Sequence, residues 1–203
     1  MINRDLIGRR FAECSFDNFE ILSSTHRTAL NACKALLSGD SSGVMLTGPV
    51  GRGKTHLLVA LAYEFNREAD FRLLDDKDYV LVEDPGNSVV FWPHIALSGG
   101  LKSEFDNGSR IHMQDCKDAD LLIIDELMSE NVTEFVIGFT QEIIEHRYNQ
   151  GSLIALSSNL EHGRLKEVYT PRIASRLTDM CRDIVMLDGD EDYRLKKHRE
   201  RNG

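Results

Sequence analysis

The stretch GPVGRGKT at residues 48–55 constrains the fold of this chain more than any other feature of its sequence. It matches Gly-x-x-x-x-Gly-Lys-Thr, the pattern of a phosphate-binding loop of the Walker A type, which follows a strand and opens a helix. Residues 43–47 (GVMLT) predict a short buried strand, and residues 55–68 carry apolar side chains at helical spacing. The sequence around the loop is therefore the setting that phosphate binding requires.

Each part of this loop has an expected role in binding the phosphates of a nucleotide, although the loop alone does not distinguish a kinase, a GTPase or an ATPase. Its glycines let successive backbone N–H groups curl around the phosphates, and the amino terminus of the following helix adds partial positive charge. Lys54 is expected to reach the β- and γ-phosphates, and the Thr55 hydroxyl to bind Mg²⁺. The predicted nucleotide-binding residues are Gly48, Pro49, Val50, Gly51, Arg52, Gly53, Lys54, Thr55 and His56. A glycine turn that contains Lys-Thr by accident is the alternative, and the pattern arises by chance in only about one chain in a hundred of this length.

A second motif, DADLLIIDELM at residues 118–128, places two acids after a run of aliphatic residues. Such a run is typical of a central parallel strand that is buried on both faces, and ligands bind at the carboxyl ends of such strands. Asp125 is expected to hold the Mg²⁺ shell, and Glu126 to polarise the attacking water. The alternative is an apolar strand followed by an exposed acidic turn.

A third strand is predicted within residues 151–160 (GSLIALSSNL), after a helical stretch at residues 132–150. Its aliphatic run also ends in small polar residues, which brings Asn159 to the same edge of the sheet as Asp125. An amide at that edge can hydrogen-bond a γ-phosphate oxygen and the attacking water, so Asn159 is a candidate sensor of the nucleotide. A helix cap is the alternative role.

The alternation of strands and helices predicts an α/β fold, a three-layer P-loop sandwich with a central parallel sheet and helices on both faces. Residues 88–92 (SVVFW) predict a further strand of this sheet. Residues 71–87 are interpreted as an acidic, turn-rich stretch that ends in a Pro-Gly-Asn loop. Residues 93–107 predict a helix that the pair Gly99-Gly100 bends or breaks.

Composition narrows the class of protein. With 203 residues, of which 41% are hydrophobic, the chain can bury one sizeable core, and we expect a single domain. No charged start followed by an apolar run is present, which predicts a cytoplasmic protein without a membrane span. The four scattered cysteines predict free thiols with a structural role. A net charge of −9 argues against a protein that coats nucleic acid by bulk electrostatics.

Taken together, the motifs resemble those of AAA+ ATPases of the bacterial helicase-loader clade, the DnaC and DnaI type, with IstB and DnaA as relatives. The resemblance covers roughly residues 10 to 195 and is carried by the order of FAECSFDNFE, GPVGRGKTHLLVALA, DADLLIIDEL, IIEHRYNQGSLIALSSNL, TPRIASRL and GDEDYR. It implies a short lead-in at residues 1–40, an AAA+ domain at residues 41–193 and a basic tail at residues 194–203, with no helical lid domain.

The resemblance also implies roles for arginines in the last third of the chain. Arg172 and Arg176 lie four residues apart in TPRIASRL and so share one helix face. Arg176 matches the family's arginine finger, which reaches into the ATP site of a neighbouring subunit, and Arg172 would assist it. Ordinary intrachain ion pairs are the alternative for both. Arg194 resembles a position that contacts nucleotide or subunit, with a solvated tail residue as the alternative.

The function that the resemblance implies is ATP-dependent loading or remodelling of a replicative DNA helicase, in DNA replication, through an ATP-bridged oligomer. Only about forty residues precede the strand before the loop, so we expect no separate amino-terminal helicase-binding domain. Single-stranded DNA is a further possible partner, with Lys102, Arg110 and His112 as candidate contacts. An IstB-like transposition helper, a small-molecule or nucleotide kinase with a phosphate-binding loop, and a nucleotide-binding adaptor that hardly turns over remain alternatives.

Overall fold

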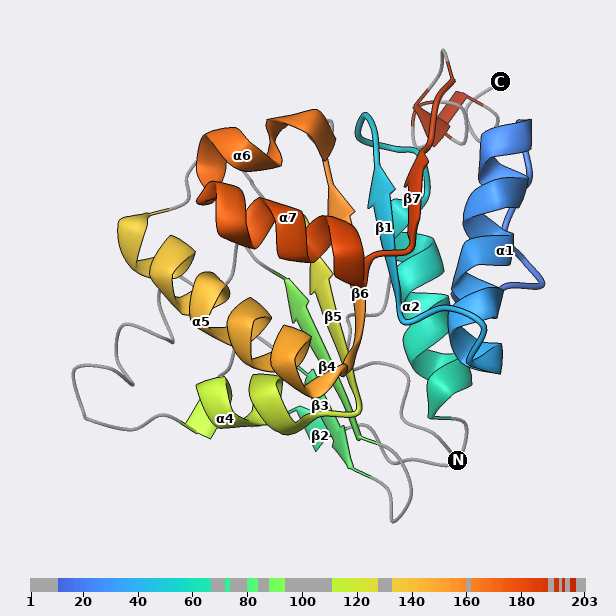
Figure 1. The fold of residues 1–203 in the computed structure, drawn as a ribbon. Helices are drawn as coiled ribbons and strands as arrows, with labels where there is room; N and C mark the ends of the chain where they lie inside the picture. Colours follow the sequence, from blue (N-terminus) through green and yellow to red (C-terminus); the bar gives the residue numbers. More distant parts are fainter. Residues whose placement is uncertain are drawn as a thin grey trace.

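A mostly parallel β-sheet forms the middle layer of the structure, with helices on both of its faces (Figure 1). The computed structural model describes residues 11–66, 72–73, 80–83, 88–93, 111–127, 133–159, 162–189, 192, 193, 195, 198 and 199. The strands are β1 (Gly43–Thr47), β2 (Arg72–Leu73), β3 (Val80–Glu83), β4 (Ser88–Pro93), β5 (Leu121–Asp125), β6 (Leu153–Ser158) and β7 (Asp183–Met186). The helices are α1 (Ser24–Ser38), α2 (Lys54–Phe65), α4 (Ile111–Asp118), α5 (Glu134–Gln150), α6 (Leu165–Val168) and α7 (Pro171–Met180), with a 3₁₀ turn, η3 (His162–Arg164), before α6.

The strand order in the described part of the sheet is β2-β3-β4-β5-β6-β1-β7. The five strands β4, β5, β6, β1 and β7 are mutually parallel, which confirms the predicted parallel sheet, although no strand was predicted at the position of β7. In this register Thr47 lies beside Ser158, and Ile124 lies beside Leu156. The carboxyl ends of β1, β5 and β6 therefore meet at one edge of the sheet, where the phosphate-binding loop and the acidic pair both begin.

The interpretation of residues 71–87 as a turn-rich stretch was wrong for two segments of it. β2 and β3 pair with each other and with β4 in the antiparallel sense, and they extend one edge of the sheet. The run Val80-Leu81-Val82 supplies the β-branched and aliphatic residues that favour a strand. The acidic residues on either side of it concealed this short strand. The Pro-Gly-Asn loop and the helix predicted at residues 93–107 lie outside the described residues, except that Pro93 ends β4.

Helix boundaries follow from local capping. Ser23 accepts a hydrogen bond from the backbone N–H of His26 at the start of α1, and Thr133 does the same for Val136 at the start of α5. Thr170 caps α7 in the same way, with a proline at its first position. α1 and α5 both end at a left-handed glycine, so each helix stops where its sequence provides a residue without a side chain.

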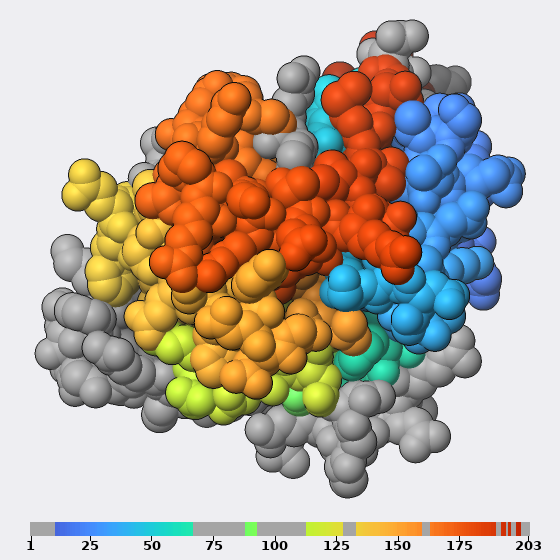
Figure 2. Space-filling model, viewed as in Figure 1, coloured from blue at the N-terminus to red at the C-terminus, as the bar shows by residue number. Residues whose placement is uncertain are grey.

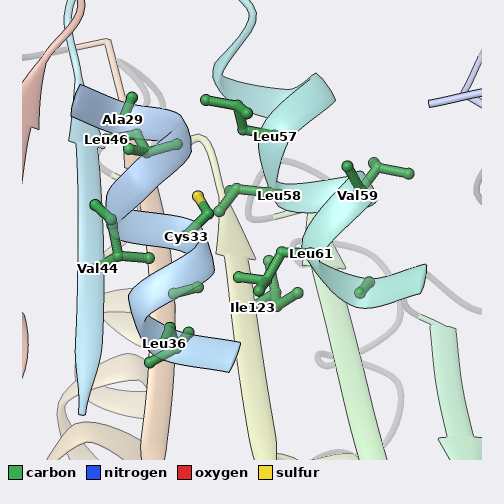
Figure 3. Packing of buried hydrophobic residues seen from close by; sticks show 14 of the residues in the cluster. Ala29, Cys33, Leu36, Val44, Leu46, Leu57, Leu58, Val59, Leu61 and Ile123 are labelled. Carbon is green, nitrogen blue, oxygen red and sulfur yellow. The ribbon is translucent and has the colours of Figure 1, made fainter. Parts of the chain in front are cut away.

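Two hydrophobic cores fill the spaces on either side of the sheet. On one face α1 and α2 pack against β1 and its neighbours, and Figure 3 shows Cys33, Leu46, Leu58 and Ile123 within this core. On the other face α4, α5 and α7 cover the sheet, and α5 and α7 lie side by side across the surface in Figure 2. All four cysteines are buried and free, as expected from their scattered positions.

Arg147 on α5 is fully buried although it carries a charge. Burial lowers the pKa of its guanidinium to about 10, so the group stays protonated at neutral pH. Its partners are five main-chain carbonyl oxygens, those of Cys116, Lys117, Ala119, Asp120 and Leu153. Arg147 thus ties the end of α4 to the start of β5 and the start of β6. No described helix is both long and apolar enough to cross a membrane.

Candidate nucleotide-binding site

The phosphate-binding loop joins β1 to α2 at the carboxyl edge of the sheet. Gly51 and Gly53 adopt left-handed backbone angles, with φ of 75° and 82°. A β-carbon on Gly51 would lie 2.1 Å from the carboxylate of Asp192, and one on Gly53 would lie 2.7 Å from the ring of Phe19. Glycine is therefore needed at both positions, for its conformation and for the closeness of neighbouring segments.

Lys54 begins α2 and is almost completely buried beneath the loop. Its ammonium group donates hydrogen bonds to the main-chain carbonyls of Gly48, at 2.6 Å, and Pro49, at 2.7 Å. These contacts hold a positive charge directly against the loop, where a polyphosphate would gain most from it. The contact of Lys54 with β- and γ-phosphates stays a prediction.

Thr55 and Asp125 connect the loop to the end of β5. The Thr55 hydroxyl lies 2.9 Å and 3.2 Å from the two carboxylate oxygens of Asp125. Burial raises the pKa of Asp125, and hydrogen bonds from Ser157 and Thr55 together with the charge of Lys54 act in the opposite direction. A hydroxyl and a carboxylate are hard oxygen ligands of the kind that Mg²⁺ prefers, so this pair fits the predicted metal. No cluster of three or more His, Cys, Asp or Glu that could hold a metal occurs among the described residues.

Glu126 and Asn159 lie at the same cleft as the loop, although they follow different strands. The cleft is lined by Phe11, Cys14, Val50, Gly51, Arg52, Gly53, Lys54, Thr55, His56, Glu126, Asn159 and Tyr193. The structure therefore brings the loop, the second acid and the amide together, and Asp125 joins them through its contact with Thr55. The catalytic roles of Glu126 and Asn159 remain predictions.

Two walls of the cleft come from segments that the loop motif does not identify. Phe11 and Cys14 belong to the lead-in, which is fastened to α2 because the His56 ring Nε2 donates to the Ser15 carbonyl at 2.9 Å. Tyr193 comes from beyond β7, and its backbone N–H donates to the carbonyl of Gly51 at 3.1 Å. In the sequence, only the aromatic residues of these segments suggest a position at the cleft. Their contacts with the loop form between segments that are distant along the chain.

The two arginines of α7 stand apart from this cleft and are already paired within the chain. Arg172 contacts one carboxylate oxygen of Glu145 at 2.6 Å, and Arg176 contacts the other. The Arg176 guanidinium also lies 5.0 Å from the centre of the Tyr148 ring. Arg172 is 69% exposed, but Arg176 is only 15% exposed. Intrachain ion pairs of this kind are what the alternative to the arginine finger expects. The finger role of Arg176 stays a prediction, because it requires the ATP site of a second subunit.

The other basic candidates are not tested by these contacts. Lys102, Arg110 and Arg194 lie outside the described residues, as does most of the basic tail. His112 lies in α4, and its side chain is outside the described part. Their contacts with DNA, nucleotide or a second subunit stay predictions.

Curated relatives of the chain share low identity over most of its length. No family model matches the chain. The replicative helicase loader DnaC of Buchnera aphidicola subsp. Acyrthosiphon pisum is 23% identical over 184 residues, which cover 87% of this chain and 68% of the loader. The ATP-binding protein of insertion sequence IS21 from Pseudomonas aeruginosa is 29% identical over 166 residues, which cover 79% of this chain and 55% of that protein.

Solved structures of similar fold include a helicase loader and a replication initiator. A structure of the DnaC helicase loader has a TM-score of 0.73 at 18% identity and covers 89% of this chain and 100% of its own. AMPPCP-bound DnaA from Aquifex aeolicus has a TM-score of 0.69 at 22% identity, covering 93% of this chain and 54% of its own. A DnaI structure has a TM-score of 0.66 at 15% identity, covering 91% of this chain and 93% of its own.

These matches agree with the α/β fold described above. The chain spans about half the length of DnaA, and it spans two thirds of the DnaC sequence, so both proteins contain more than the part compared. No helical lid follows β7 among the described residues. The chain therefore has the fold of AAA+ ATPases and is related, at low identity over most of its length, to the DnaC and DnaI helicase loaders, to IstB and to DnaA.

Proposed function

We propose that this chain binds ATP with Mg²⁺ and hydrolyses it between neighbouring subunits of an oligomer, and that it uses this cycle to load or remodel a replicative DNA helicase. The observation that carries the proposal is the contact between Thr55 and Asp125, which joins the phosphate-binding loop to the acidic end of β5. A loop hydroxyl beside a strand-end carboxylate is the arrangement that NTPases of this fold use to hold the metal.

Five residues at the site have a part in this cycle. Lys54 holds the β- and γ-phosphates, and Thr55 with Asp125 holds Mg²⁺, which supplies charge neutralisation at the phosphates when it is bound. Glu126 accepts a proton from the attacking water, and Asn159 orients that water against the γ-phosphate. The AMPPCP-bound DnaA of similar fold supports a nucleotide in this cleft. Bound ATP would join neighbouring subunits, and its hydrolysis would release the partner.

Replacing Lys54 with alanine should weaken ATP binding by about 30-fold, because the change removes one charge-assisted contact to the phosphates. The affinity can be measured by titration with a fluorescent ATP analogue. The matched control is Lys166→Ala on α6, which changes an exposed lysine outside the cleft and should leave the affinity unchanged. Equal affinity in the two variants would show that the loop does not hold the phosphates.

If the ATP site of one subunit is completed by Arg176 of a neighbouring subunit, hydrolysis should depend on protein concentration. Turnover per subunit should rise as the protein is concentrated, because Arg176 can stabilise the γ-phosphate only in a neighbouring subunit. In Arg176→Ala this rise should disappear, with turnover at high concentration lower by about 100-fold and ATP affinity unchanged. The measurement is ATP hydrolysis across a concentration series.

Arg164 supplies the control for this experiment. It is an exposed arginine that pairs with Glu167 at 2.8 Å, as Arg176 pairs with Glu145, but it lies before α6. Arg164→Ala should keep the full concentration dependence. Turnover that is flat in the wild-type protein and unaffected in Arg176→Ala would leave Arg176 as an ordinary ion-pair partner and would remove the oligomer from the proposal.

The helicase partner rests on the relatives alone. DnaC of Buchnera is a replicative helicase loader, and a DnaA of similar fold has been solved with AMPPCP and single-stranded DNA. The assay is deposition of a purified replicative helicase onto protein-coated single-stranded DNA, with ATP and with AMPPCP. Deposition that needs this chain and is followed by release only with ATP supports loading.

A transposition helper is the second candidate, and the similarity to the IS21 ATP-binding protein favours it. The same ATP cycle would then act on a transposase rather than a helicase. Binding of the purified chain to each of the two partners, with and without ATP, separates these functions. A kinase is disfavoured for two reasons. Glu126 in the cleft is suited to activate water rather than another phosphate acceptor, and Arg52 is the one arginine among the described residues that line the cleft, whereas a kinase needs several basic residues over the phosphates.

A further inference from the structure

We propose that Ser157 is a positioning residue that sets the geometry of both acids, Asp125 and Glu126. Ser157 lies on β6, one strand away from the acids, and is fully buried. The inference rests on the proposed function, because it assigns a support to the two residues that hold the metal and activate water. It adds a residue that neither the loop motif nor the acidic motif contains.

Three hydrogen bonds connect Ser157 to the end of β5. Its hydroxyl donates to a carboxylate oxygen of Asp125 at 2.5 Å. The same hydroxyl accepts from the backbone N–H of Glu126 at 2.9 Å, and the Ser157 carbonyl accepts from the N–H of Leu127 at 2.7 Å. A serine hydroxyl has a single proton, and the backbone N–H of Glu126 can only donate. The proton of Ser157 is thus directed to Asp125, and the carboxylate is held in one orientation.

The backbone of Glu126 explains why such a support is needed. Glu126 has a φ of 60°, and it is the one non-glycine residue with a positive φ among those described. A side chain disfavours this left-handed conformation, so surrounding contacts must impose it. Ser157 provides them, because its hydroxyl and its carbonyl bind the N–H groups of Glu126 and of the next residue.

The left-handed turn has a consequence for the site. Successive side chains of an extended strand point to opposite faces, so Asp125 and Glu126 would diverge if β5 simply continued. The turn at Glu126 interrupts this alternation. Asp125 then reaches Thr55, while Glu126 lines the same cleft. Ser157 therefore maintains the backbone geometry by which two consecutive acids serve one site.

The test uses Ser157→Ala, which removes the hydroxyl and leaves the strand. We expect kcat to fall about 10- to 100-fold and the Mg²⁺ concentration for half-maximal activity to rise about 10-fold, as when a hydrogen bond to a ligating carboxylate is lost. ATP affinity, measured with a fluorescent analogue, should stay within about 2-fold, because the phosphate-binding loop is untouched. Ser157→Thr keeps the hydroxyl and should recover most of the loss in kcat.

Ser41→Ala is the matched control. Ser41 is also buried, and its hydroxyl donates to a main-chain carbonyl, that of Gly43, at 3.1 Å. The Ser41→Ala variant should lose thermal stability to a similar degree as Ser157→Ala, but its kcat and its Mg²⁺ dependence should stay those of the wild-type protein. If Ser157→Ala changes only thermal stability, as Ser41→Ala does, the residue is structural and the proposal is overturned.

A double mutant separates this inference from the proposed function. At saturating Mg²⁺, where the effect through Asp125 is compensated, Ser157→Ala should add little to the loss in kcat already caused by Glu126→Gln, while the Mg²⁺ requirement still rises through Asp125. Losses that multiply in full would show that Ser157 acts independently and would overturn the inference. Failure of the proposed function has a different result, namely no ATP hydrolysis by the wild-type protein or no effect of Glu126→Gln. An active wild-type protein that is sensitive to Glu126→Gln but not to Ser157→Ala overturns the inference alone.

Discussion

Glu126→Gln is expected to reduce ATP turnover on the order of 1,000-fold while leaving ATP affinity unchanged. Glutamine has the same shape as glutamate and can still bind water, but it cannot accept the proton that the attacking water loses. Lys54, Thr55 and Asp125, which are expected to hold ATP and Mg²⁺, are unaltered. Steady-state hydrolysis gives the loss in kcat, and titration with a fluorescent ATP analogue gives the affinity.

Glu167→Gln serves as the control, since Glu167 is 54% exposed on α6 and lies outside the cleft. It should hydrolyse ATP like the wild-type protein. If Glu126→Gln does so as well, Glu126 is not the base. If wild-type turnover is itself close to zero, the chain would fit a nucleotide-binding adaptor, in which ATP is held and turnover has no part in partner binding.

Arg147→Met should lower the free energy of unfolding by about 3–5 kcal/mol, because each buried carbonyl left without a hydrogen bond costs about 1–3 kcal/mol and the chain relaxes only in part. Methionine fills similar space, but it leaves five main-chain carbonyls without their donor. Arg147→Lys should recover only part of the loss, because an ammonium has three donors and lacks the planar fork of arginine. Urea unfolding followed by circular dichroism measures both changes.

Arg164→Met is the comparison for this stability measurement. Arg164 is 54% exposed, and removing an exposed ion pair should change the free energy of unfolding by at most about 1 kcal/mol. An Arg147→Met protein as stable as Arg164→Met would mean that water replaces the guanidinium at these carbonyls. Arg147 would then have no essential part in joining α4, β5 and β6.

The sequence predicted the parts of the structure that depend on neighbours along the chain. The aliphatic runs identified β1, β5 and β6, because central parallel strands need apolar side chains on both faces. The helix after the loop was expected from residue 55, and α2 begins at Lys54. The agreement is close because the glycines and the lysine of the loop are placed by local backbone geometry. The convergence of the strand ends followed from the parallel sheet.

What the sequence did not predict depends on contacts between distant segments. Ser157 and Glu126 are 31 residues apart, and no spacing rule connects a strand serine to a turn on another strand. Tyr193 meets Gly51 only because β7 pairs with β1 and directs the following residues toward the loop. Arg147 resembles any helical arginine in the sequence, because its carbonyl partners, from the end of α4 and the start of β6, come together only in the fold.

Glu145 shows how the α7 arginines can serve two states of the protein. One carboxylate is shared by Arg172 and Arg176, so it keeps a counter-charge when either arginine leaves. In the proposed oligomer Arg176 would leave Glu145 and contact the γ-phosphate bound by the neighbouring subunit. The exposed Arg172 would stay paired with Glu145. Because this exchange leaves neither Arg176 nor Glu145 without an opposite charge, a small gain in free energy from the new contact is enough to drive it. If Arg176 acts as the proposed finger, the shared pairing with Glu145 would lower the cost of its release and return.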